Sequence, residues 1–235
     1  FGLVNWIGFR SLWLKECNRF MAVWQQTLLS PLVSSLLFLS VLSLALGNNR
    51  GDVLGYSFIS FLAPGLIAMS ILTQSFSHSV SSLMIGKIQG NIVDTLMPPL
   101  SAGELLIGYL SGALGRSILI SIAMMIGMVL FLGIEIVYPF RALCFILLGS
   151  LFLGTLGIMA AIYANKFDQM STITNFVITP LAFLSGSFYS IEALPEGVRQ
   201  LAFYNPLFYL IDGTRYSILG ISDCNPITSC IAVAC

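Results

Sequence analysis

Long runs without a charged side chain divide this sequence, and they constrain its fold more than any other feature. Residues 20–49 and residues 53–86 contain no Asp, Glu, Lys or Arg. An ionised side chain at the centre of a bilayer costs about 2.5–3.5 kcal/mol on insertion scales, so uncharged runs of this length predict membrane-crossing helices. Only 9% of all residues are charged, whereas an average soluble domain carries roughly 25%. A water-soluble surface cannot be built from so few charges.

The uncharged runs and the turn residues between them predict an all-α polytopic membrane protein. Each crossing requires about 20 residues, so residues 1–235 are expected to form a single transmembrane domain with six membrane-crossing helices. The predicted spans are residues 28–46, 56–80, 104–134, 142–165 and 169–191, with a sixth at 226–235. Because the chain begins at Phe1 and stops inside an apolar run, we expect both ends to be cut from a longer protein and the sixth span to be truncated.

Residues 192–223 differ from these spans, because prolines and scattered charges surround a short apolar run. That run has only about 12 residues, too few to cross a bilayer. The segment is predicted to be re-entrant or interfacial. Three basic residues precede the first span, Arg10, Lys15 and Arg19. The positive-inside rule and the even number of spans then place both termini in the cytoplasm.

The first 25 residues have two unlike faces when they are projected as a helix. One face carries Trp6, Trp13, Cys17, Phe20 and Trp24. The opposite face carries small, polar and basic residues, Gly8, Ser11, Lys15, Asn18 and Arg19. This pattern predicts an amphipathic helix in the membrane interface, with the aromatic side chains at headgroup depth. The alternative is a cytosolic segment packed on itself.

The inner loop at residues 86–100 contains a possible short helix at 91–97. Pro98 and Pro99 must end that helix, because proline clashes with the preceding turn and lacks a backbone N–H. Ser101 and Glu104 then form the pattern of a capping box at the start of the third span. A stiff helix between two spans is suited to transmit force from a soluble partner. The alternative is an ordinary loop packed on the membrane.

Arg116 is the one cation inside a predicted span, and His78, the only histidine, also lies in one. Arg116 must face protein, water or the interface, so it is either part of a substrate path or helix pair, or it reaches toward the inner surface. His78 could relay protons with Glu104, Glu135 or Asp168, but these three carboxylates lie near predicted span ends. A proton-coupled carrier normally requires ionisable groups at greater depth.

The sequence contains no pattern typical of an enzyme, a metal site or a nucleic-acid-binding protein. It has no Gly-x-x-x-x-Gly-Lys-Ser/Thr loop and no His-Glu-x-x-His. Its five cysteines form no Cys-x-x-Cys pair, and His78 is the only histidine, so no metal-ligand spacing is present. Ten basic and ten acidic residues give a net charge of +0, which argues against binding of nucleic acid.

Three motifs resemble the type-2 ABC transporter permease family, and the resemblance covers nearly the whole chain. They are Phe61-Leu62-Ala63-Pro64-Gly65-Leu66, then Leu96-Met97-Pro98-Pro99-Leu100-Ser101 with Glu104 and Gly108, and finally Asn205-Pro206 with Gly213 and Arg215. Bacterial exporters of this family have an interfacial N-terminal helix, six spans and a re-entrant outer helical hairpin before the last span. The resemblance implies that residues 187–215 form this outer re-entrant segment.

The resemblance implies that residues 91–97 are the coupling helix, which docks on an ATPase subunit. The residues that it implies for this coupling are Asn91, Ile92, Asp94, Thr95, Leu96 and Met97. Family members consist of two permease chains and two ATPase chains, and the ATPase uses ATP and Mg²⁺. This chain is therefore expected to bind no cofactor or metal, and to have no ATPase site of its own.

The resemblance also implies a substrate path at the interface of two copies of the chain, within the membrane lipids. The implied lining residues are Phe61, Thr73, Phe76, Arg116, Phe176, Phe183 and Tyr189. The expected function is that of a permease subunit in the bacterial inner membrane, which exports a hydrophobic or amphipathic substrate such as a lipid-linked glycan, a lipid or a drug. The alternatives are an ion-coupled secondary carrier and a membrane scaffold that transports nothing.

Overall fold

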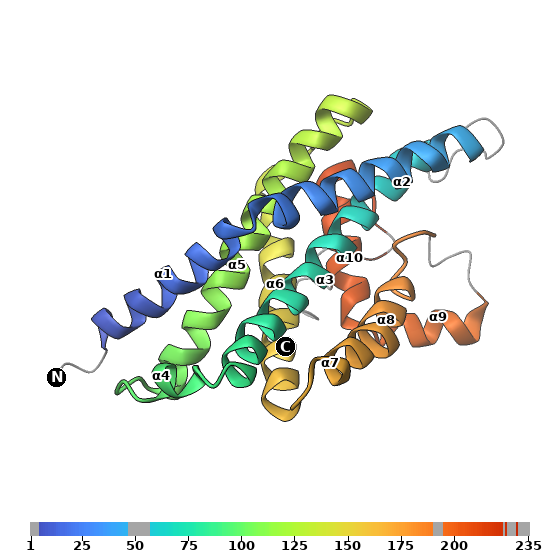
Figure 1. The fold of residues 1–235 in the computed structure, drawn as a ribbon. Coiled ribbons are helices and arrows are strands. Elements are labelled where there is room, and N and C mark those ends of the chain that lie inside the picture. Colours follow the sequence, from blue (N-terminus) through green and yellow to red (C-terminus); the bar gives the residue numbers. More distant parts are fainter. Residues whose placement is uncertain (1–4, 47–56, 190–194, 223, 225–228, 230–235) are drawn as a thin grey trace.

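The computed structural model describes residues 5–46, 57–189, 195–222, 224 and 229, and every regular element in this part of the chain is a helix. In chain order the elements are α1 Trp6–Ala22, η1 Gln25–Leu29, α2 Ser30–Leu46, α3 Phe58–Ile88, α4 Ile92–Leu96, α5 Ala102–Gly127, η2 Met128–Leu132, α6 Pro139–Tyr163, α7 Phe167–Ile173, η3 Thr174–Ile178, α8 Thr179–Phe183, α9 Glu196–Phe203 and α10 Pro206–Leu219. The three η elements are π-helical turns that adjoin α-helices (Figure 1). The predicted all-α class is confirmed for the described residues.

Four helical stretches are long and apolar enough to cross a membrane. They are Gln25–Ala45, Phe58–Ile88, Ala102–Phe131 and Pro139–Tyr163, and they overlap the first four predicted spans. In its described part, the fifth predicted span begins within α7 and continues through η3 and α8. These three elements follow one another from residue 167 to 183 and form a shorter helix than the other four. The sixth predicted span lies outside the described residues, apart from Ser229.

The N-terminal helix α1 runs beside α5 and continues through η1 into α2 in nearly one direction (Figure 1). Glycines of α5 make this close approach possible. A Cβ atom at Gly108 would lie 2.4 Å from Leu12, and one at Gly112 would lie 2.7 Å from the Cβ of Glu16. Small residues let helix backbones approach closely, so α1 packs on the bundle along its length. The position of α1 relative to the membrane stays a prediction.

Helices α3 and α6 form the centre of the bundle, and small residues again determine how closely they pack. A Cβ atom at Gly157 of α6 would lie 2.8 Å from the backbone oxygen of Phe76. Lys87, in the last turn of α3, donates hydrogen bonds of 3.0, 2.9 and 2.6 Å to the carbonyl oxygens of Ala161, Ile162 and Ala164. These carbonyls lie at the end of α6, where helical partners are missing and a cation is favourable. Lys87 therefore joins the ends of the two central helices.

Helix α10 packs against α3 and α6, and most of its side chains are buried. Its N-cap is Asn205, whose Oδ1 accepts from the backbone N of Leu207 at 3.0 Å and whose Nδ2 donates to Leu181 O at 2.7 Å. It has 14 residues, or about 21 Å at 1.5 Å per residue, which is too short to cross a bilayer. The preceding helix α9 is exposed except at Ala202, which is buried, and Phe203, which is half-buried. The re-entrant position of this pair stays a prediction.

Candidate functional site

Helix α4 lies between the end of α3 and the start of α5, at one end of the bundle, called here the α4 end (Figure 1). Two prolines, Pro98 and Pro99, follow its C-cap Met97 and prevent its continuation. Helix α5 then begins at the predicted capping box, which is confirmed. Ser101 Oγ accepts from Glu104 N at 3.3 Å, and Glu104 Oε2 accepts from Ser101 N at 2.7 Å. The sequence signals on both sides of α4 thus make it a separate short helix between two long ones.

Contacts with α1 hold this corner of the molecule together. Lys15 Nζ donates to Thr95 Oγ1 at 3.3 Å, which joins α1 to α4. The backbone N of Asn5 donates to Glu104 Oε1 at 2.7 Å, which joins the start of α1 to the start of α5. A force on α4 would therefore reach α1 and α5 through hydrogen bonds as well as through the chain.

The outer side of α4 is apolar apart from one carboxylate. Val93, Leu96 and Met97 are 54%, 60% and 77% exposed, and Asp94 lies between them in sequence and is also exposed. We call these four residues the α4 surface. Of the other residues predicted to couple to an ATPase, Asn91 is exposed, Ile92 is half-buried and Thr95 is buried. The structure thus separates them into an outward group and a group that attaches α4 to the bundle, and their coupling role stays a prediction.

A second feature is a polar cluster between α1, α3 and α5. Its members are Glu16 and Arg19 of α1, Gln74, His78 and Ser82 of α3, and Arg116 of α5. Glu16 is 1% exposed, accepts from Ser82 Oγ at 2.7 Å, and lies 3.4 Å from Arg19 Nη2 and 3.7 Å from His78 Nε2. Buried charges are normally paired in this way, because an unpaired one loses its hydration without compensation.

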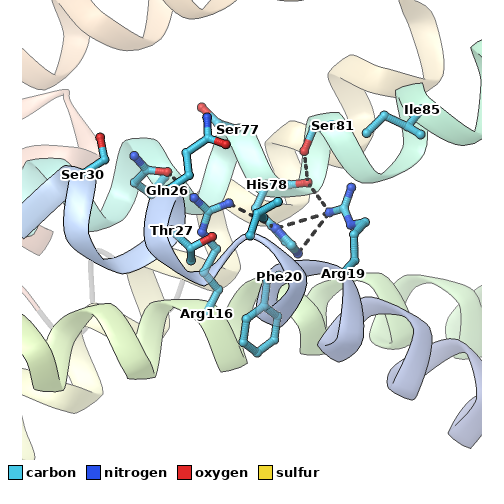
Figure 2. A pocket seen from close by; sticks show the side chains of 12 residues that line it. Arg19, Phe20, Gln26, Thr27, Ser30, Ser77, His78, Ser81, Ile85 and Arg116 are labelled. Atoms are coloured by element: carbon cyan, nitrogen blue, oxygen red, sulfur yellow. Dashed lines mark hydrogen bonds between the residues drawn. The ribbon is translucent and has the colours of Figure 1, made fainter.

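The two arginines of the cluster approach the same imidazole ring from different sides (Figure 2). Arg19 Nη2 lies 3.2 Å from both ring nitrogens of His78, and Arg116 Nη1 lies 3.3 Å from Nδ1. Guanidinium groups only donate hydrogen bonds, so the ring must accept and is therefore neutral. Arg19 Nη2 also donates to the backbone oxygen of His78 at 3.2 Å, and Arg116 Nη2 donates to Gln74 Oε1 at 2.6 Å.

The charges of the cluster do not balance. Glu16 neutralises Arg19, while Arg116 lies within 4.0 Å of no carboxylate in the described part of the chain. Burial lowers the pKa of Arg19 from its ordinary value, and the nearby Glu16 carboxylate acts in the opposite direction. Both guanidinium groups remain cationic, because arginine does not lose its proton in proteins. The cluster therefore carries one positive charge in excess.

A cavity with a volume of about 470 Å³ adjoins this excess charge. Figure 2 shows its twelve lining residues, which come from α1, its C-cap Val23, η1, the start of α2, α3 and α5. Its polar lining includes Arg19, Arg116, Thr27, Gln74 and Ser77. It falls within the usual size of a small-ligand site, roughly 300–1,000 Å³.

The residues predicted to line a substrate path differ in their exposure. Phe61 and Phe76 are each 1% exposed and face the interior of the chain, where Arg215 lies 4.1 Å over the Phe61 ring. Phe176 and Phe183 are 78% and 48% exposed on η3 and α8. The half-buried residues are Thr73, which bonds to backbone oxygens of its own helix, Arg116 in the polar cluster, and Tyr189, whose hydroxyl donates to Phe183 O. Their role in transport stays a prediction.

The sequence reasoning missed the partners of His78. The three carboxylates considered for it lie elsewhere, since Glu104 occupies the capping box while Glu135 and Asp168 are exposed. Its actual neighbour is Glu16, which the amphipathic projection left out. A signal was present, because Leu12, Glu16 and Phe20 recur every four residues and therefore share one face of α1. That face is the one that packs on α5.

These features define the class of the protein. Four helices long enough to span a bilayer and a short helix displayed at one end are those of a polytopic helical membrane protein. The model of the family described as ABC-2 type transporter matches residues 8–219, and the chain belongs to that family. The predicted family is thereby confirmed.

Curated relatives show the same similarity over most of the chain. The inner membrane transport permease YadH of Escherichia coli K12 is 34% identical over 225 residues, which cover 95% of this chain and 88% of YadH. Nodulation protein J of Rhizobium leguminosarum bv. viciae is 28% identical over 219 residues, covering 88% of this chain and 82% of that protein. Nodulation protein J of Rhizobium meliloti is 27% identical, with 92% and 82% covered.

Proposed function

We propose that this chain is the permease subunit of an ATP-driven exporter in a bacterial inner membrane, and that a separate ATPase docks on its α4 surface. The observation that carries the proposal is the α4 surface itself. It holds three exposed apolar side chains and one carboxylate on a short helix between α3 and α5. An exposed apolar patch with a polar rim is typical of a protein-protein contact. Family membership and the inner-membrane relative YadH support the same assignment.

The contacts around α4 give this docking surface a mechanical role. ATP binding draws the two ATPases together and moves each α4, and the Lys15–Thr95 and Asn5–Glu104 hydrogen bonds pass that movement to α1 and α5. Two copies of the chain with two ATPase chains would then open a path between the copies toward the outside. A hydrophobic or amphipathic substrate would leave by this path. Both termini face the cytoplasm in this arrangement, on the same side as α4.

The first experiment asks whether an ATPase subunit co-elutes with the full-length protein when it is purified from its native host in mild detergent. The Leu96→Glu/Met97→Glu variant places two charges in the α4 surface and should abolish co-elution. Asp94→Asn tests the single carboxylate and should reduce ATP turnover of the complex. An ATPase that co-elutes equally with the double variant would contradict the docking proposal.

The control variant for this experiment is Phe140→Glu. Phe140 is 84% exposed near the start of α6, at the opposite end of the bundle, so the substitution has the same chemistry at a comparably exposed position. Co-elution should survive it. Efflux that continues without any ATPase and stops when the proton gradient is dissipated would instead identify a secondary carrier, and absence of any flux would identify a scaffold.

A further inference from the structure

The cavity beside His78 has the composition of an anion site. No acidic residue is among its twelve lining residues, whereas two arginines are. The carboxylate of Glu16 neutralises Arg19 from outside the lining, and Arg116 lies against a neutral histidine and an amide. A cation held in a partly buried, polar cavity without a matching carboxylate is stabilised by an anion.

Unsatisfied hydrogen-bond donors on the lining residues also favour an anion site. Arg19 Nε, Arg116 Nε and Thr27 Oγ1 are buried and lack a hydrogen-bond partner among the described residues. Glu16 Oε2, outside the lining, is a buried acceptor that likewise lacks a hydrogen-bond partner among the described residues. Buried donors are normally satisfied, and an oxyanion in the cavity would supply acceptors for donors on its lining residues. Two guanidinium groups and a hydroxyl suit a phosphate-type oxyanion, whose several oxygens accept charge-assisted hydrogen bonds.

The rest of the lining is mixed, with apolar side chains beside Gln26, Ser30 and Ser81. Phe20, Val23 and Ile85 also line the cavity, and Val23 and Ile85 are 49% and 36% exposed. An acyl chain could therefore pass beside them while its headgroup lies at the arginines. This combination is what an anionic amphiphile requires.

We propose that this cavity binds the phosphate group of an anionic amphiphile, with Arg116 and Arg19 as the cationic anchors and Thr27 as a hydroxyl donor. The binding site follows from the geometry of this chain, and only the statement that the bound amphiphile is the exported substrate rests on the proposed function. In that case the substrate is recognised by its anionic headgroup before it reaches the interface between two copies.

Native mass spectrometry of the full chain in a neutral detergent tests this proposal. The probes are phosphatidic acid and phosphatidylcholine with identical acyl chains. The wild type should retain the first phosphatidic acid at least about tenfold more tightly than phosphatidylcholine, and Arg116→Gln should weaken that binding about tenfold, as expected for loss of a charged hydrogen-bond partner. Arg141→Gln removes the same charge from an exposed position near the start of α6 and should bind like the wild type.

Equal retention of the two lipids by the wild type would overturn the proposal, and this comparison needs no variant. Full phosphatidic acid affinity in a folded Arg116→Gln protein would overturn it as well. Excess inorganic phosphate separates the two sources of the anion. If phosphate displaces bound phosphatidic acid, the site also accepts free phosphate. If phosphatidic acid is retained, the site is specific for the lipid. Both results support an anion site.

These measurements use no ATP and no ATPase, so their outcome is separate from that of the exporter experiments. Anion-selective binding without efflux would support the binding site and contradict the exporter proposal. ATP-driven efflux without anion-selective binding would support the exporter and contradict the binding site.

Discussion

Replacement of Glu16 by glutamine removes the one carboxylate that lies against Arg19 and His78 in the described part of the chain. The amide oxygen can still accept the hydrogen bond from Ser82. The variant therefore loses the negative charge but keeps nearly the same side-chain shape. Arg19 then keeps its hydrogen bond to the His78 carbonyl but has no counter-ion, and its side chain is 26% exposed. Removal of one partner from a buried ion pair costs about 3–5 kcal/mol, and the partial exposure of Arg19 places this case near about 3 kcal/mol.

The converse substitution, Arg19→Gln, leaves the 1%-exposed Glu16 without its cation and should cost a similar amount. In the double variant no unpaired charge remains at this pair. Its loss of stability should therefore be smaller than the sum of the two single losses by about 2 kcal/mol, within the usual coupling energy of contacting residues.

Reversible unfolding by SDS in mixed micelles, followed by tryptophan fluorescence, measures these effects. The three tryptophans of the chain are Trp6, Trp13 and Trp24, all on α1 or directly after it, so their emission reports the separation of α1 from α5. Glu196→Gln, on the exposed helix α9, is the matched control. A Glu16→Gln protein within about 0.5 kcal/mol of the control, or additive single losses, would refute the account of the polar cluster.

Two further substitutions test the packing of α3 against α6. Gly157→Ala forces a Cβ atom to within 2.8 Å of the Phe76 carbonyl and should lower the free energy of unfolding by about 1–3 kcal/mol, whereas Gly103→Ala, which meets nothing within 4 Å, should not. Equal unfolding curves for the two variants would contradict this. Lys87→Met removes three hydrogen bonds to carbonyls at the end of α6 and should cost about 1–3 kcal/mol. Hydrogen exchange of amides in the last turn of α6 should accelerate in Lys87→Met, and unchanged exchange would argue against the cap.

Local signals predicted the features that depend on a few neighbouring residues. Apolar runs with few or no charges located the four long helices because hydrophobicity is a property of each segment by itself. Ser101 and Glu104 predicted a helix start, and Pro98 and Pro99 predicted the end of α4, because capping and proline geometry act within one turn. Each family motif likewise lies within a short stretch of sequence, and the match over residues 8–219 agrees with them.

The polar cluster depends on tertiary structure instead. Glu16 and Arg116 are a hundred positions apart in the sequence, and they meet at His78 only because Gly108 and Gly112 let α1 lie against α5. The burial of the predicted substrate-path residues depends on helix packing in the same way. The sequence marks Phe61 as an aromatic residue in a span, but only the packing of α10 places Arg215 over its ring and buries it.

The sequence by itself determined that this chain is a helical membrane protein of the ABC-2 type transporter family with a short helix between two spans, since each of those properties is encoded locally. Tertiary structure alone decided which charges are paired, which aromatic side chains are buried and where a cation is left in excess. Those outcomes depend on distances between helices far apart in sequence, and small residues such as Gly112 and Gly157 determine those distances through the space that a missing side chain leaves.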